Sequence, residues 1–408
     1  MKASRWLRDL YRRISSTKLV LVSDAPIPEK PLLIAHFFLN RLSTSLEDST
    51  HLSAAMGWLC RAQDACKSKG VSAVYDIGKG WAVAYPETSG YIIGTYLAYA
   101  ELAQNSEFVD RAIQLGDWEI EIQTASGGVI SSPVKPTTRV FNTGQVLLGW
   151  CALYEKTKAT RYLNAALRAG QFLVDTQEED GAWRRNTYCG ARTYHARVDW
   201  ALLRLSELSG DEKFRQTAVH NIEWILQQHN GAGWFRNCGF EDYAPITHVI
   251  GYTLRGLLES SQFDTGTIRD LELLSYVAAG ANSICDVTTR GGIKEVPGLL
   301  PTSFDSQWNS VDKHSCLTGN AQLSCLLFRL AAITGCGRYK DTAESIVEAV
   351  KKTQLLESSF EQARGAIPGT FPFSFGYHAN SYPNWATKFF ADALMMKIRY
   401  GDGCYVPA

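Results

Sequence analysis

The sequence Gln177-Glu178-Glu179-Asp180-Gly181-Ala182-Trp183 is the strongest indication of the fold, because versions of it recur along the chain. Gln123 precedes Thr-Ala-Ser-Gly-Gly, and Gln228 precedes a glycine-containing turn that ends at Trp234. The steps between these glutamines are 177 − 123 = 54 and 228 − 177 = 51 residues. At looser spacing the series continues at Gln63, Asp286 and Gln354. A period of about 50 residues indicates one supersecondary unit used repeatedly.

Each unit has helical hydrophobic spacing. Apolar residues follow the i, i+3, i+4, i+7 pattern in 144–154, and partner segments such as 162–176 are apolar on one face only. Segments 247–258, 317–332 and 385–396 are apolar on nearly all sides, as expected for helices buried inside a ring of others. Six units of two helices predict an all-α fold, a closed (α/α)6 toroid or six-hairpin barrel. We expect one toroid domain over 45–400, an N-terminal helix and lead-in over 1–44, and a C-terminal tail over 401–408.

Composition favours a soluble globular protein and argues against a nucleic-acid partner, because 41 basic residues balance 41 acidic ones. The ten cysteines include no C-x-x-C pair, which favours a reducing cytoplasm. Phosphate-loop and dinucleotide signatures are missing, so no cofactor is expected. No metal is expected either, since the spacing of the possible ligands matches no standard zinc site. Those possible ligands are Cys189, His195, Cys238, His314 and Cys316.

The N-terminal residues 2–18 combine a basic face with an apolar stripe. Lys2, Arg5, Arg8, Arg12, Arg13 and Lys18 surround Trp6, Leu7, Leu10, Tyr11 and Ile14. The apolar run 19–22 is too short for a signal peptide. We expect this helix to pack on the toroid, with peripheral contact to an anionic membrane as the alternative. The predicted location is therefore cytoplasmic, possibly membrane-peripheral.

Function is expected where the inner helices begin. Six turn clusters each open a helix on polar, often aromatic residues, and a ring would gather these openings around one cavity. Helix N-termini present unpaired N–H groups and partial positive charge, which favour anionic or hydroxyl-rich ligands. Aromatic rings can stack on the apolar faces of sugars. We interpret Trp183 and Trp234, which follow equivalent turns, as packing wedges between repeats rather than sugar platforms.

The turn 177–183 resembles the Q-x-x-D-G-x-W turn found across α/α toroids. These include six-hairpin glycosidases, uronate-polysaccharide lyases, glucuronyl epimerases and triterpene cyclases, although the chain lacks the cyclases' acidic D-x-D-D string. Longer strings resemble uncharacterised bacterial proteins associated with exopolysaccharide synthesis, namely Tyr85–Ile93, Thr247–Leu258, Cys316–Gln322 and Pro383–Asp392. The resemblance implies a polysaccharide partner but supplies no catalytic assignment.

Proton abstraction beside a uronate carboxylate is the first chemical hypothesis. A uronate lyase or epimerase needs Tyr or His as base and cationic or amide groups to stabilise the enolate. His248, Tyr252 and Arg255 fall on one helical face. We predict His248, Tyr252, Tyr194 and Glu87 as catalytic residues. Predicted substrate-binding residues are Arg197, Arg255, Tyr85, Asn142, Trp308, Asn320, Gln322, Tyr377, Asn384, Trp385 and Lys388.

Two alternatives remain open. A six-hairpin glycoside hydrolase needs two carboxyl groups across the scissile bond, and a non-catalytic glycan-binding or scaffold protein needs none. Carboxyl candidates for hydrolysis are Glu87, Asp199, Glu241, Asp242, Asp305 and Asp312. Three of these residues also have a purely structural alternative: Glu87 could complement a helix dipole, Asp199 could hold Arg197, and His248 could be a buried histidine bonded to a carbonyl.

Overall fold

In the computed structural model, residues 2–241, 244–263 and 266–400 are described, so the predicted tail 401–408 lies outside the described residues. Helices dominate the described chain, and the predicted all-α toroid is confirmed. The outer helices are α3 (Asp48–Asp64), α5 (Glu107–Glu121), α7 (Thr160–Thr176), α9 (Glu212–Leu226), α12 (Leu273–Thr289) and α14 (Gly337–Lys351). The inner helices are α4 (Pro86–Ala103), α6 (Val140–Thr157), α8 (Ala196–Ser209), α10 (Thr247–Ser260), α13 (Leu317–Thr334) and α15 (Asn384–Ile398).

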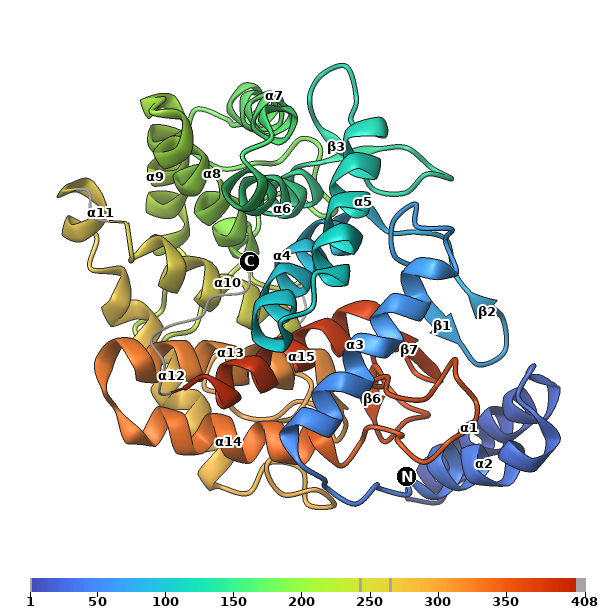
Figure 1. The fold of residues 1–408 in the computed structure, drawn as a ribbon. Helices are drawn as coiled ribbons and strands as arrows, with labels where there is room; N and C mark the ends of the chain where they lie inside the picture. Colours follow the sequence, from blue (N-terminus) through green and yellow to red (C-terminus); the bar gives the residue numbers. More distant parts are fainter. Residues whose placement is uncertain (1, 242–243, 264–265, 401–408) are drawn as a thin grey trace.

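The inner helices form a closed ring. Each contacts the next along the chain, and α15 contacts both α13 and α4, so the last hairpin meets the first (Figure 1). Side chains join the two ends: Thr95 Oγ1 donates to Asp392 Oδ1 at 2.8 Å, and Asn384 Nδ2 donates to Thr88 Oγ1 at 2.8 Å. Residues almost 300 positions apart in sequence are thereby neighbours.

Burial separates the two layers of helices. Every residue of α10 is buried, as the all-apolar pattern of 247–258 predicts, whereas α7 buries one face and exposes the other. The inner layer is therefore enclosed by the outer helices and by its own neighbours.

The glutamine at the end of an outer helix binds two backbone segments at once. Gln177 Nε2 donates to Gly181 O at 3.0 Å within its own turn and to Thr217 O at 2.8 Å on α9. Gln123 repeats the arrangement, with Gly127 O at 2.8 Å and Ala165 O, on α7, at 3.0 Å. Each amide thus ties one hairpin to the next outer helix.

The glycine of this turn is required for the same contact. Gly181 has φ +84°, and a Cβ there would lie 2.3 Å from His220 O of α9. At Gly127, with φ +88°, a Cβ would lie 2.2 Å from Arg168 O of α7. Only glycine combines this left-handed conformation with so close an approach of two backbones.

The same device closes the ring, while one copy departs from it. Gln354 Nε2 donates to Gly365 O at 2.6 Å and to His51 O at 3.2 Å, which joins the last turn to α3. His51 Nδ1 lies 2.5 Å from Gln354 Oε1. Gln228, by contrast, donates only to Trp224 O in its own helix, at 3.2 Å. Trp183 is fully buried and donates to Leu173 O at 2.9 Å, as expected of a packing wedge.

Short strands, which the sequence analysis did not anticipate, position the inner-helix openings. A three-stranded sheet has the order β2-β1-β7, where β1 is Val74–Asp76, β2 is Gly80–Trp81 and β7 is Ser381–Pro383. The pairs β3·β4 and β5·β6 comprise Val129–Ile130 with Thr138–Arg139 and Ser315–Cys316 with Thr370–Phe371. β4, β5 and β7 lead directly into α6, α13 and α15. Strands of two or three residues leave no alternating pattern to detect.

The N-terminal helices lie on one side of the ring (Figure 1). They are α1 (Lys2–Val22), η1 (Ile27–Glu29) and α2 (Lys30–Leu39). A short helix, α11 (Gly266–Asp270), lies on the opposite side of the ring. His36 stacks on Phe373 at 3.9 Å, and Ser358 Oγ donates to Glu29 Oε2 at 2.7 Å. Membrane contact through residues 2–18 stays a prediction.

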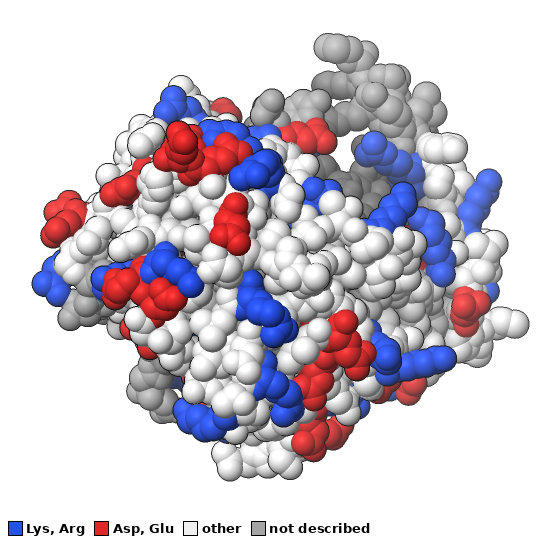
Figure 2. Space-filling view, turned by 90° about the horizontal axis from the view of Figure 1, so that it is seen from above, with Lys and Arg blue, Asp and Glu red and all other residues white. Residues whose placement is uncertain are grey.

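Surface charge is mixed. Basic and acidic side chains are interspersed on the face shown in Figure 2, in keeping with the balanced composition. Among the described residues, the helices are too short or too polar to cross a bilayer.

Replacing Gln354 with Ala should destabilise the toroid by about 2–4 kcal/mol, because two backbone carbonyls and His51 lose a buried partner. Gln228→Ala is the matched control, since its amide bonds only Trp224 O and Asn237 Nδ2 of its own hairpin, and it should cost less than about 1 kcal/mol. Urea unfolding measures both free energies. Equal losses in the two variants would show that ring closure does not depend on this amide.

Candidate active site

The predicted catalytic residues come together at the inner-helix openings. Glu87 lies on α4, Arg197 on α8, and His248 and Tyr252 on α10. The rings of His248 and Tyr252 are 4.6 Å apart, and the Arg197 guanidinium carbon lies 5.4 Å from the Tyr252 ring. The charge of Glu87 raises the pKa of Tyr252 after the larger effect of burial, so Glu87 faces the same space. We call this group of buried side chains, Glu87, Arg197, His248 and Tyr252, the bowl; they come from three hairpins.

Glu87 is poised to exchange a proton near neutral pH. Its side chain is buried, and burial raises the pKa of the carboxyl to about 7, although Tyr85 and Arg197 act to lower it. A helix-dipole role alone would favour the ionised form and lower the pKa. The environment of Glu87 therefore suits proton transfer.

A chain of hydrogen-bond contacts connects the buried Glu87 to the exposed side chain of Tyr188. The Tyr85 hydroxyl lies 2.7 Å from Glu87 Oε2 and 2.9 Å from the Tyr188 hydroxyl, which donates to Asn142 Oδ1 at 2.9 Å. Three contacts need three hydrogens, but the two tyrosines supply only two. A proton on Glu87 supplies the third, because Glu87 can then donate to Tyr85, Tyr85 to Tyr188, and Tyr188 to Asn142. The count of hydrogens thus favours the neutral carboxyl, whereas a Tyr85 hydroxyl that donates to Glu87 favours the ionised one and lowers its pKa.

His248 is a neutral imidazole with a fixed tautomer. Burial lowers its pKa to about 3. Its Nδ1 lies 3.0 Å from Gln322 Oε1, and an amide oxygen only accepts, so Nδ1 carries the hydrogen. The lone pair is left on Nε2, where a base needs it. The partner is a side-chain amide rather than the backbone carbonyl considered from sequence.

His378, which the sequence analysis missed, is a second imidazole at this site. It lies in the irregular segment before β7, with its ring 4.6 Å from Tyr377 and 4.8 Å from Trp385. The Tyr377 ring is 5.7 Å from His248, so both histidines border one tyrosine. Burial lowers the pKa of His378 to about 4, so it too is neutral at pH 7. Its only sequence signal was its place beside Tyr377, ahead of the last inner helix.

The tyrosine hydroxyls of the site hold their protons tightly. Burial raises the pKa of Tyr252 and of Tyr194, and nearby negative groups raise both further. The buried hydroxyls of Tyr252 and Tyr91 lie close enough to shift each other's pKa, and Gln322 acts on the pKa of Tyr252 as well. The Tyr194 hydroxyl contacts Cys189 Sγ at 3.5 Å. The expectation of a tyrosine base is therefore not supported, and histidine is the better candidate.

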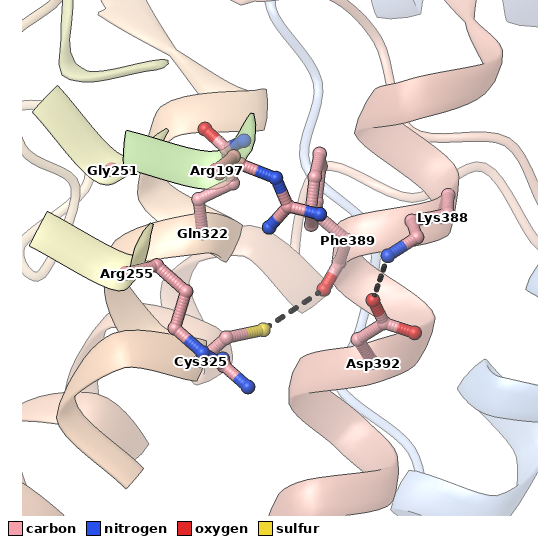
Figure 3. Close-up of a pocket in the computed structure, with 8 residues that line it drawn as sticks. All are labelled: Arg197, Gly251, Arg255, Gln322, Cys325, Lys388, Phe389 and Asp392. Atoms are coloured by element: carbon pink, nitrogen blue, oxygen red, sulfur yellow. Dashed lines mark hydrogen bonds and ion pairs between the residues drawn. The ribbon is translucent and has the colours of Figure 1, made fainter. Parts of the chain in front are cut away.

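Beneath the bowl lies a small polar pocket that contains Arg197, Arg255, Gln322 and Lys388 (Figure 3). Arg255 Nε donates to Glu259 Oε1 at 2.6 Å, so it pairs with an inner acid. Lys388 Nζ lies 2.5 Å from Asp392 Oδ2. The sequence analysis expected these side chains to bind substrate, and the structure brings them together below the imidazoles.

Other predicted binding residues support loops instead. The amides of Asn320 and Asn384 are buried and donate to backbone carbonyls at Cys316 and Ser72. Trp308 packs at 5.7 Å against Trp234, and its indole N–H donates to Ala232 O at 2.9 Å, which leaves no polar atom for a ligand. Asn142 accepts the last hydrogen bond of the chain that begins at Glu87, from the Tyr188 hydroxyl. The remaining predicted binding residues Tyr85, Tyr377 and Trp385 border the bowl.

The proposed hydrolase carboxyls do not assemble with Glu87. Asp199 is buried without a hydrogen-bond partner among the described residues, and burial raises its pKa well above the usual value. It does not hold Arg197, whose Nε donates to Gln145 Oε1 at 2.7 Å. Asp305 accepts from its own loop, Asp312 contacts Ser303, Glu241 is exposed, and Asp242 lies outside the described residues. Nowhere in the described part of the chain do three potential metal ligands gather.

Comparisons with known proteins show the fold. Neither the protein-family models nor the curated protein sequences gave a match. An unsaturated glucuronyl hydrolase from Bacillus sp. GL1 superposes with a TM-score of 0.69 at 16% identity, over 87% of this chain and 97% of that one. A sugar epimerase from a ruminal bacterium gives 0.69 at 12% over 88% and 99%, and a polysaccharide lyase gives 0.63 at 13% over 88% and 99%. All share the six-hairpin toroid.

Removing the Tyr188 hydroxyl should lower the pKa of Glu87 by about one unit. When Glu87 is ionised, Tyr85 donates to it, and the Tyr85 and Tyr188 oxygens are left in contact with no hydrogen between them. The substitution removes this unfavourable contact and so favours the ionised carboxyl. Tyr188 is 41% exposed, so Tyr188→Phe should fold normally. Infrared spectroscopy of the protonated carboxyl across pH 4–9 measures the pKa. Tyr194→Phe, outside the chain, should leave it unchanged; an unshifted pKa in Tyr188→Phe would refute the proton count.

Proposed function

We propose that the protein is a carbohydrate-active enzyme that moves a proton at the carbon beside the carboxylate of a uronic acid in a glycan. Epimerisation is the reaction we propose first, and lyase chemistry is the second candidate. The observation that carries this proposal is the pair of neutral imidazoles, His248 and His378, that border one bowl. Each has a free lone pair at neutral pH, because burial keeps both uncharged, and the same burial makes each a weaker base than an exposed imidazole. Similarity in fold to a sugar epimerase and to uronate-acting enzymes supports the same class.

The proposed reaction uses the two imidazoles in sequence. One removes the hydrogen from the sugar carbon, and the electron pair of the broken C–H bond moves into the carboxylate to form an enolate. The other imidazole takes up a proton from water and delivers it to the opposite face of the same carbon, and the first imidazole returns its proton to water. In this mechanism Arg197 and the buried hydroxyl of Tyr252, which lie close together, stabilise the enolate oxygen.

Uronate recognition follows from the charge of the site. Arg197 is buried and donates from Nε to the neutral amide oxygen of Gln145, so among the described residues no carboxylate is bonded to its charge. A substrate carboxylate would compensate it, whereas a neutral sugar would not. Tyr85, Tyr377 and Trp385 supply aromatic surface for the ring of the sugar.

Glu87 favours a second candidate reaction. A neutral carboxyl at pH 7 can protonate a glycosidic oxygen as it leaves, which a lyase or a hydrolase requires. A conventional hydrolase also needs a second free carboxylate, and Asp392, the other acid nearby, is occupied by Lys388 and Thr95. Lyase chemistry is therefore the stronger second candidate. The bacterial exopolysaccharide setting and the cytoplasmic location remain parts of the proposal that rest on sequence.

Deuterium exchange in single histidine variants separates these reactions. With a panel of uronate-containing glycans in D2O, the wild type should incorporate deuterium at the carbon beside the carboxylate without cleaving the chain. His248→Asn and His378→Asn should each lose epimerisation by at least about 10²-fold, yet each should retain exchange of one epimer only, because one base survives. Circular dichroism checks folding. Unchanged turnover in either variant would exclude the two-base mechanism.

Replacing Glu87 with Gln distinguishes proton exchange from bond cleavage. Epimerisation should fall by no more than about tenfold, whereas a lyase or hydrolase that uses Glu87 as its acid should lose about 10²–10⁴-fold. An acid with a pKa of about 7 is protonated below pH 7, so cleavage that depends on it would decline as the pH rises through 7. Ultraviolet absorbance reports unsaturated products, and reducing-end assays report hydrolysis. Cleavage that survives in Glu87→Gln would remove Glu87 from both mechanisms.

A further inference from the structure

The outward face of helix α1 is apolar. Tyr11, Ile14, Leu21 and Val22 are spaced i, i+3, i+10 and i+11, which places them within one arc of about 100° on the helix. All four are exposed, Tyr11 by 72% and Val22 by 74%, and Ile27 at the start of η1 is exposed by 82%. We call these five side chains the outer stripe. A helix that served only to cover the toroid would turn its apolar side chains inward, so the outer stripe points to another partner.

The opposite face of α1 attaches the helix to the rest of the protein. Ser16 and Val20 lie on that face and are buried, and α1 contacts α2. The side chain of Leu19 lies close to Gly78, in the turn between β1 and β2, because a Cβ on Gly78 would come within 2.6 Å of it. α1 is thus held through these side chains, while the outer stripe faces solvent.

Basic side chains border the outer stripe. Lys18 lies within the same arc of α1 and is exposed. Lys30 Nζ donates to Leu21 O at 2.5 Å, which holds a second ammonium group beside the end of the stripe. In sequence, residues 2–30 contain seven Lys or Arg and three Asp or Glu. The surface thus combines apolar side chains with an excess of positive charge.

This combination fits an anionic bilayer better than a second copy of the chain. Two copies that met through α1 would bring their like charges together, which opposes association. Negatively charged headgroups instead attract each Lys or Arg near the surface, and the lipid beneath them accepts apolar side chains to a depth of about 5–10 Å. Of the three acids, Glu29 is already bonded to Ser358 and Ser359 of the toroid. Anionic lipid therefore matches both properties of the surface.

We infer that α1 docks the protein on a membrane that contains anionic lipids, with the outer stripe below the headgroups and Lys18 and Lys30 among them. Docking has a consequence for the position of the bowl. The Arg12 guanidinium carbon lies 5.5 Å from the ring of Phe375, which is three residues before His378 in the same loop. This loop would then lie about one helix diameter, roughly 10 Å, from the membrane surface.

Sedimentation with lipid vesicles tests the docking surface without any substrate. The wild type should bind vesicles of phosphatidylcholine with about one third phosphatidylglycerol at least about tenfold more tightly than vesicles of phosphatidylcholine alone. Ile14→Asp combined with Lys18→Glu should lower the affinity for the anionic vesicles by at least about tenfold. Val134→Asp combined with Lys135→Glu is the matched control, because it makes equivalent changes at the exposed turn between β3 and β4, and it should bind as the wild type does.

Three results would overturn the proposal. These are a wild type that does not bind anionic vesicles, equal affinities of the two double variants, and equal binding to vesicles with and without phosphatidylglycerol. Analytical ultracentrifugation supplies the remaining alternative: a dimer that only the α1 variant loses would assign the outer stripe to a second copy of the chain. Circular dichroism checks that both variants fold. Vesicle binding does not depend on turnover, so failure of the proposed epimerase activity would leave this test intact.

Discussion

The contact of a glutamine-glycine turn with the next outer helix, made at Gln123, Gln177 and Gln354, is the constraint on which the ring of hairpins depends. The amide of Gln177 binds its own turn and the backbone of α9, while Gly181 lets the two backbones approach to a distance that no side chain permits. Repetition of one rigid contact rotates each hairpin relative to the last. After six hairpins Gln354 reaches His51, and α15 meets α4. The chain closes because the contact is repeated, not because any single one is strong.

Closure of the ring brings the ionisable groups of the site together and buries them, which shifts their pKa values. Inner helices from distant parts of the sequence bring cations, imidazoles and tyrosines into a space with little water, and burial then shifts each group in a predictable direction. Carboxyl and hydroxyl groups hold their protons more tightly, and imidazoles lose theirs. Glu87 is consequently poised near pH 7, while His248 and His378 stay neutral. One physical cause thus provides a proton donor and two proton acceptors side by side.

The toroid could be predicted from sequence because its determinants are local and repeated. Helical periodicity, the turn around Gly181 and the all-apolar inner segments each follow from short-range patterns. Much of the site could be located as well, since Glu87, Arg197, His248 and Gln322 lie at or soon after inner-helix openings. His378 could not, because it lies in an irregular loop whose path is set only by contacts with distant segments.

Roles were harder to predict than positions. Asn320 and Asn384 open inner helices as binding residues would, but their amides are consumed by loop backbone, which only the three-dimensional hydrogen-bond network reveals. The same holds for Trp308, whose indole fills a gap beside Trp234. The different hydrogen bonds of Gln228 could not be predicted from the sequence either, because the residues that follow it include the same glycines and tryptophan as the other turns.

The central claim is that His248 and His378 act on opposite faces of one sugar carbon. A crystal structure of the protein with a bound glucuronate-containing oligosaccharide tests it most directly. The account predicts a uronate ring beside Tyr377, with the carbon next to its carboxylate within about 3–3.5 Å of an imidazole nitrogen on each side. A sugar bound elsewhere on the toroid, or one that contacts neither imidazole, would contradict it.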